Sequence, residues 1–163
     1  MMIGLQERKE KRMPDKAEIS RMTTYLFDCD FFADDFDPEE QEDHLKCAEN
    51  LLGTYSWSDI FPSWNAFLRN RCSTPEEVIN FCNLFFYYGG TDQFIPDPYG
   101  FLGYIYYMVD TEKYWEEAGE FLDGFCINVL EKAGEISTMK DPYYQSWKDP
   151  KIISAVERYR NPK

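Results

Sequence analysis

Histidine is almost absent from this sequence, because His44 is the only one among 163 residues. Any catalytic triad or dyad that uses an imidazole would depend on His44, and a metal site with two histidine ligands cannot form within one chain. A di-iron helical bundle needs a second histidine as well, and a glutamate where Gln41 stands. The sequence therefore predicts no catalytic residue, no metal site and no cofactor. We expect His44 at the border of a helix whose buried side carries Leu45, Ala48 and Leu52.

Basic residues are scarce relative to acidic ones. The chain has 17 lysines and arginines against 30 aspartates and glutamates, which gives a formal net charge of −13. A charge of that sign repels phosphate backbones and anionic lipid surfaces, so the composition argues against direct nucleic-acid binding and against membrane binding. The one locally basic stretch is residues 1–21. Within it, we expect residues 1–14 to form a flexible basic lead-in.

Long apolar runs and paired cysteines are also missing. The first 30 residues contain no continuous apolar region of the kind that a signal peptide needs. No stretch reaches the roughly 18 apolar residues of a membrane span. The five cysteines are widely spaced and never form a Cys-x-x-Cys pair. These absences predict a cytoplasmic protein with reduced thiols and no disulfide.

Apolar and aromatic residues, by contrast, are plentiful. They make up 44% and 18% of the chain, which is enough apolar surface to offset the entropy lost when a chain of this length folds. Helix starts are marked by a capping residue followed by proline, which is favoured at the first helical position. These pairs are Asp37-Pro38, Thr74-Pro75, Asp97-Pro98 and Asp149-Pro150.

Apolar spacing supports the same helices. Glu77 completes a capping box with Thr74, and the apolar residues that follow repeat at helical spacing until Gly89-Gly90. Residues 111–133 keep a period of about 3.6, although Gly119 and Gly124 each weaken that helix by roughly 1 kcal/mol. No segment shows the sustained alternation of a strand. We predict an all-α fold, a compact bundle of about six or seven helices, with residues 15–163 as a single α-helical domain.

A faint internal repeat appears when the chain is shifted by 34 residues. The shift aligns Leu51-Leu52 with Phe85-Phe86, Ile60-Phe61-Pro62 with Phe94-Ile95-Pro96, and Phe67-Leu68 with Phe101-Leu102. The period is that of tetratricopeptide-like helix pairs, but only two units align, whereas solenoids generally need three or more. The repeat predicts two similar helix–loop–helix layers within the compact bundle.

The segment from Tyr25 to Asp43 mixes large apolar side chains with nine acidic residues and has no lysine or arginine. Such a composition is typical of segments that dock in basic, hydrophobic grooves, where aromatic residues anchor and carboxylates orient. The partner-binding residues that this interpretation predicts are Phe27, Asp28, Asp30, Phe31, Phe32, Asp34, Asp35 and Phe36. The same composition also fits a helix end followed by an acidic helix start, since carboxylates stabilise helix N-termini.

These patterns predict a non-enzymatic protein that binds, and thereby inhibits or tethers, a protein partner with a basic surface. Two alternatives stay open. One is an enzyme or a small-ligand-binding bundle with a pocket lined by Tyr87, Tyr88, Tyr104 and Tyr107. The other is a DNA mimic that inhibits a nucleic-acid-handling protein, with carboxylates in rows that imitate phosphates.

Overall fold

The computed structural model describes residues 15–136 and 142–162. These residues form seven α-helices and three short 3-10 helices, and they contain no strand. The α-helices are α2 (Lys16–Phe27), α3 (Pro38–Thr54), α4 (Trp57–Arg71), α5 (Pro75–Tyr87), α6 (Pro98–Val109), α7 (Trp115–Lys132) and α8 (Pro150–Arg160). The 3-10 helices are η1 (Gly90–Asp92), η2 (Glu112–Tyr114) and η3 (Ser146–Lys148). The all-α prediction is confirmed, and the expected lead-in, residues 1–14, lies outside the described residues.

The predicted helix starts are confirmed by their hydrogen bonds. Asp37, Asp97 and Asp149 are the N-cap residues of α3, α6 and α8, and each side chain accepts from a backbone N–H of the first turn. At α5 the Glu77 N–H donates to Thr74 Oγ1 at 3.3 Å, and the Thr74 N–H donates to Glu77 Oε1 at 3.1 Å. These bonds satisfy N–H groups that have no partner within the helix.

Helix α4 has the same kind of start without a proline at its first position. Ser56 accepts from the Asp59 N–H at 3.3 Å, and the Asp59 carboxylate accepts from the Ser56 N–H at 3.3 Å, which forms a second capping box. Pro62 lies inside this helix. A proline there supplies no N–H to the carbonyl four residues earlier, which is that of Ser58.

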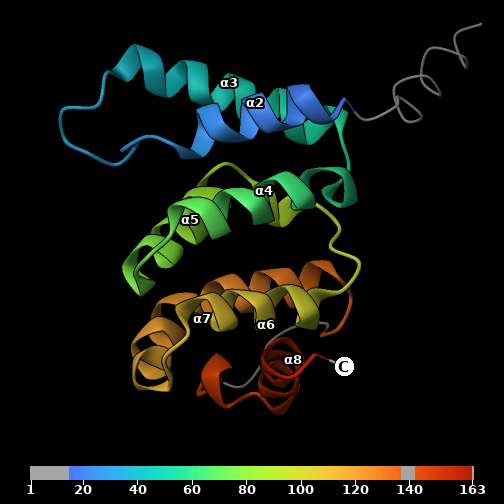
Figure 1. Cartoon of the computed structure of the whole chain (residues 1–163). Coiled ribbons are helices and arrows are strands. Elements are labelled where there is room, and N and C mark those ends of the chain that lie inside the picture. Colours follow the sequence, from blue (N-terminus) through green and yellow to red (C-terminus); the bar gives the residue numbers. More distant parts are fainter. Residues whose placement is uncertain (1–14, 137–141, 163) are drawn as a thin grey trace, which may run out of the picture.

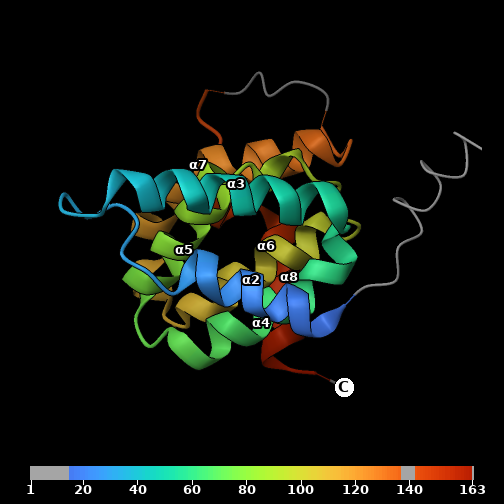
Figure 2. The same ribbon diagram turned by 90° about the horizontal axis from the view of Figure 1, so that it is seen from above.

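The helices stack in successive pairs. Figure 1 shows the pairs α2–α3, α4–α5 and α6–α7 one above another, with α8 packed against α6. Figure 2 shows the stack from above, with α2 over α4 on one side and α3 and α7 on the other. The 34-residue shift relates α3–α4 to α5–α6, but residues 60–62 lie within α4 whereas residues 94–96 lie in the loop before α6. The repeat therefore relates one pair of helices to the next, but the start of α6 does not correspond to the start of α4.

Aromatic rings from three different helices form the centre of the core. Trp64 of α4 is fully buried, and its ring centroid lies 5.1 Å from that of Phe85 and 5.6 Å from that of Phe101. Glycine allows the closest helix contact, because a Cβ at Gly103 would lie 2.3 Å from the Cβ of Ala155 in α8. The core thus extends through the whole stack.

Candidate functional site

The aromatic residues of the acidic segment divide between core and surface. Phe27 and Phe31 are only 4% and 3% exposed, and their rings lie 5.6 and 5.5 Å from the ring of Tyr88. Both were expected to contact a partner, but in the fold they join α2 and the following loop to α5. Their burial removes them from any partner surface, because a partner could reach them only if this end of the stack opened.

Phe32, by contrast, points away from the core and meets Tyr87 at the surface. These side chains are 49% and 52% exposed, and their rings pack edge to face with centroids 5.5 Å apart. Phe36 is half-buried against Phe31, at a centroid distance of 5.5 Å. Two tight turns place Phe32 outward, since the Ala33 N–H donates to Asp30 O and the Phe36 N–H donates to Ala33 O.

The carboxylates of the same loop differ in their partners. Asp28 forms a two-pronged ion pair with Arg71 of α4, with N–O distances of 2.8 and 2.9 Å. Asp30, Asp34 and Asp35 are exposed and form no ion pair with the described residues. We call the set Asp30, Phe32, Asp34, Asp35 and Tyr87 the acidic–aromatic surface.

His44 has a structural position beneath this loop. It is 3% exposed, and its Nδ1 and Nε2 lie 2.7 Å from Glu40 O and 3.0 Å from Tyr25 O, respectively. Its ring stacks on that of Tyr25 at 4.0 Å. The expectation of a border position with Leu45 buried was wrong: Leu45 is 39% exposed, because α3 turns His44, Ala48 and Leu51 inward. His44 therefore ties the end of α2 to the start of α3.

The four tyrosines that were expected to line a pocket reach different parts of the fold. The hydroxyl of Tyr88 donates to Leu26 O of α2 at 2.8 Å, while that of Tyr104 donates to Asn65 O of α4 at 3.4 Å. Tyr107 stacks on Tyr159 of α8, and Tyr87 lies at the surface. Burial raises the pKa of Tyr88, and it raises the pKa of Tyr104 to about 12, so both phenols remain protonated donors.

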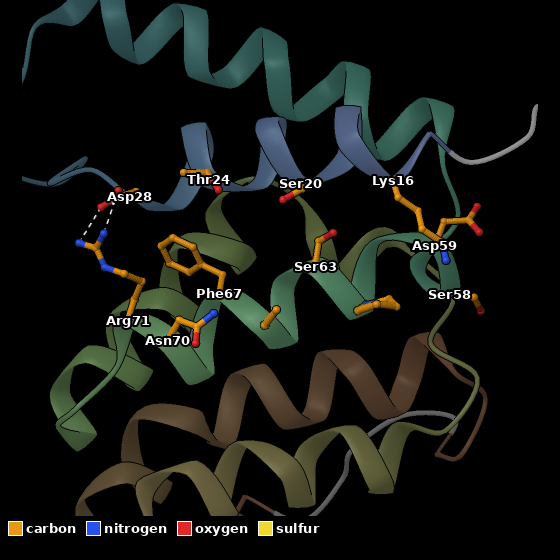
Figure 3. Close-up of a pocket in the computed structure, with 12 residues that line it drawn as sticks. Lys16, Ser20, Thr24, Asp28, Ser58, Asp59, Ser63, Phe67, Asn70 and Arg71 are labelled. Carbon is orange, nitrogen blue, oxygen red and sulfur yellow. Dashed lines mark hydrogen bonds and ion pairs between the residues drawn. The ribbon is translucent and has the colours of Figure 1, made fainter.

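A polar groove lies between α2 and α4 (Figure 3). Its volume is about 520 Å³, and Lys16 stands near one end while the Asp28–Arg71 ion pair closes the other. The side chains that face each other across it are mainly small and polar: Ser20 and Thr24 from α2, and Ser63 and Asn70 from α4. No motif in the sequence pointed to this groove, because its two walls come from separate helices that are distant in the chain.

The groove offers hydrogen bonds without an activated nucleophile. Its hydroxyls have no imidazole beside them, since the chain's one histidine lies between α2 and α3 and contacts backbone carbonyls. Its two carboxylates already have structural partners: Asp28 pairs with Arg71, and Asp59 completes the capping box of α4. A hydroxyl needs an adjacent base to become a nucleophile, and neither of these carboxylates is free of a structural role.

The cysteines do not form a reactive or metal-binding site in the described residues. All five thiols are free, and Cys82 and Cys126 are fully buried. Burial raises the pKa of both, and it raises the pKa of Cys72 to about 12, which keeps the sulfur atoms protonated and weakly nucleophilic. Residues 15–136 and 142–162 hold no group of three or more side chains arranged to bind a metal ion.

Comparisons with known proteins give no relative from which a function could be transferred. The chain matches no protein-family model, no curated protein and no solved structure closely enough to establish a relationship. Within the described residues, no helix is long and apolar enough to cross a bilayer. The function must therefore be argued from the surfaces themselves.

Proposed function

We propose that this protein binds another protein through the acidic–aromatic surface, and that the partner presents a basic patch with an apolar or cationic anchor. The observation that carries the proposal is the pair Phe32 and Tyr87. These two rings are about half exposed and lie edge to face beside three carboxylates that have no cation among the described residues. The aromatic pair is held in place by the buried ring of Phe31, which lies 5.3 and 5.2 Å from the two ring centroids.

The physical chemistry of such a surface suits a basic protein. Exposed aromatic rings are suited to anchor an interface, because they bury a large area with few rotatable bonds, and tyrosine is among the residues enriched at binding hot spots. Unpaired carboxylates attract a cationic partner and orient it, and this effect appears mainly in the association rate. The net charge of −13 extends the attraction over the whole molecule.

The experiment begins with capture of the tagged protein from its own cells, followed by kinetics with the purified partner. Asp30, Asp34 and Asp35 are changed together to asparagine, and Phe32→Ser is tested separately. Asp28 is left intact, because its loss would also break the ion pair with Arg71. The triple change should slow association and flatten its salt dependence, while Phe32→Ser should mainly speed dissociation.

Matched control variants make the same kinds of substitution on other surfaces of the protein. Glu116, Glu117 and Glu120 are exposed on α7, so their joint change to glutamine removes the same charge from a different surface. Phe94 is 65% exposed, and Phe94→Ser matches the aromatic change. The proposal is overturned if the controls weaken binding as much as the loop variants, or if the captured partner has no basic surface.

A further inference from the structure

A second site lies on a different part of the molecule, between the start of α4, the loop before α6 and the end of α8. It is a pocket of about 300 Å³, a volume at the lower end of small-ligand sites. We call it the proline pocket, and its walls are mainly aromatic and proline side chains: Trp57, Phe61, Pro62, Pro96, Phe101 and Tyr159. The site does not overlap the acidic–aromatic surface.

Two segments that the 34-residue shift aligns meet at this pocket. The 34-residue shift aligns Phe61-Pro62 with Ile95-Pro96, and both pairs line the proline pocket although one lies within a helix and the other in a loop. Phe101 is buried, and its ring lies 5.1 Å from Trp57 and 6.1 Å from Phe61, which fixes the aromatic wall. The packing of the helices in the stack therefore forms this pocket.

A backbone carbonyl of a residue that lines the pocket lacks its helical donor. In α4 the carbonyl of Ser58 would accept from the N–H four residues later, but that residue is Pro62, which has no N–H. Ser58 and Pro62 both line the pocket.

A polar feature of the pocket is the carboxylate of Asp97, the one charged side chain that lines it. Its Oδ1 accepts from the Gly100 N–H at 3.0 Å and caps α6. A carboxylate can accept about four hydrogen bonds, so the group keeps capacity for a further donor. Trp57 and Phe101 are only 4% exposed, so the accessible aromatic surface of the pocket comes from the half-buried Phe61 and Tyr159. The pocket thus combines aromatic surface with a carboxylate, and its lining includes no cation to balance that carboxylate.

We propose that the proline pocket binds an arginine side chain presented by another protein. A guanidinium stacks on aromatic rings, donates several hydrogen bonds in one plane and pairs well with a carboxylate, while its aliphatic stem packs on proline rings. This chain's own arginines show the same preference: the guanidinium of Arg160 lies 5.2 Å from the ring centroid of Trp115. The proposal is independent of the acidic–aromatic surface, so either can fail alone.

The test uses the full chain and a pair of small probes. Acetyl-Gly-Arg-Gly-amide carries the guanidinium, and its citrulline counterpart has the same shape without charge. Binding is followed by the shifts of the Trp57 indole N–H and the Gly100 amide in nitrogen–proton NMR spectra. A single side chain should bind in about the millimolar range, and the citrulline probe should bind at least about tenfold more weakly.

Two aspartates provide matched variants. Asp97→Asn keeps an oxygen for the cap of α6, because asparagine caps helices as well as aspartate does, and should weaken arginine binding about tenfold. Asp149→Asn makes the same change at the Asp-Pro start of α8, outside the pocket, and should leave binding unchanged. Pro62→Ala removes a proline ring that lines the pocket, so this second variant should also weaken binding.

Three results would overturn the proposal. The first is the absence of shifts at Trp57 and Gly100 with the arginine probe up to tens of millimolar. The second is equal binding of the citrulline probe or equal binding by Asp97→Asn, because either shows that charge is not recognised. The third is a set of shifts confined to Phe32, Tyr87 and their neighbours, which would place arginine binding on the acidic–aromatic surface instead.

Discussion

Gly119 and Gly124 lie five residues apart in α7 and should respond in opposite directions to the same substitution. Each is a helix-interior glycine, so alanine at either position recovers roughly 1 kcal/mol of helix propensity. The two positions differ in what a new methyl group would contact. A Cβ at Gly124 meets nothing within 4 Å, whereas a Cβ at Gly119 would lie 2.0 Å from Cε3 of Trp147.

These contacts set the expected magnitudes. Gly124→Ala gains the propensity without any packing cost, so the free energy of unfolding should rise by about 0.5–1 kcal/mol. Gly119→Ala must displace the Trp147 ring and with it η3, and overpacking of this kind costs about 1–3 kcal/mol. After the gain in propensity is subtracted, Gly119→Ala should lower the free energy of unfolding by up to about 2 kcal/mol.

Urea titration followed by far-ultraviolet circular dichroism measures both values. Circular dichroism is preferred to tryptophan fluorescence, because one of the variants disturbs the environment of Trp147 directly. Equal slopes against urea for wild type and variants would show that the surface exposed on unfolding is unchanged. If Gly119→Ala were as stabilising as Gly124→Ala, the close packing of η3 against α7 would be refuted.

Three further predictions concern single side chains. Pro62→Ala should raise the free energy of unfolding, measured by urea titration, by about 1–3 kcal/mol. The reason is that Pro62 is exposed and its replacement restores a helical hydrogen bond. A decrease would contradict this account of α4. Tyr106→Phe should lower it by about 1–2 kcal/mol, since the buried hydroxyl lies 2.6 Å from Ser146 Oγ; an unchanged value would mean that this bond adds no net stability. Hydrogen bonds from the backbone N–H and then the hydroxyl of Ser73 hold the pKa of Glu77 below its usual value of 4.5. The stabilisation from Glu77 is therefore present above that value and is lost as the pH falls through the lower folded value. Glu77→Gln should accordingly lose less stability than wild type between about pH 5 and pH 3, and parallel losses would rule out this role for Glu77.

Much of the secondary structure was predictable, because a helix start depends on neighbours in the chain. A cap such as Thr74 reaches only to the N–H of Glu77, so four consecutive residues contain the whole interaction. The start of α4 carried a similar signal, since Ser56 and Asp59 have the spacing of a capping box, although no proline follows Ser56. The start of α4 was not among the predicted starts, because those were identified by a capping residue followed by proline. A cap does not require that proline.

The candidate surfaces were predictable only in composition. Phe31 and Phe32 are adjacent and chemically identical, yet one is 3% exposed and the other 49%. Which of them faces outward depends on two local turns in the loop and on the position of α5, and the position of α5 is not encoded in the residues around Phe31. The proline pocket depends in the same way on residues from three separated parts of the chain.

The sequence by itself determined the helical class, the positions of most helix starts and the strongly acidic charge, because these follow from residue types and from contacts within one helical turn. Tertiary structure alone decided which aromatic rings are buried and which glycine can accept a methyl group. It also decided that Asp97, Trp57 and Pro62 line the same pocket. Those outcomes depend on the packing of side chains distant in the chain, and the same local pattern can face either the core or the solvent.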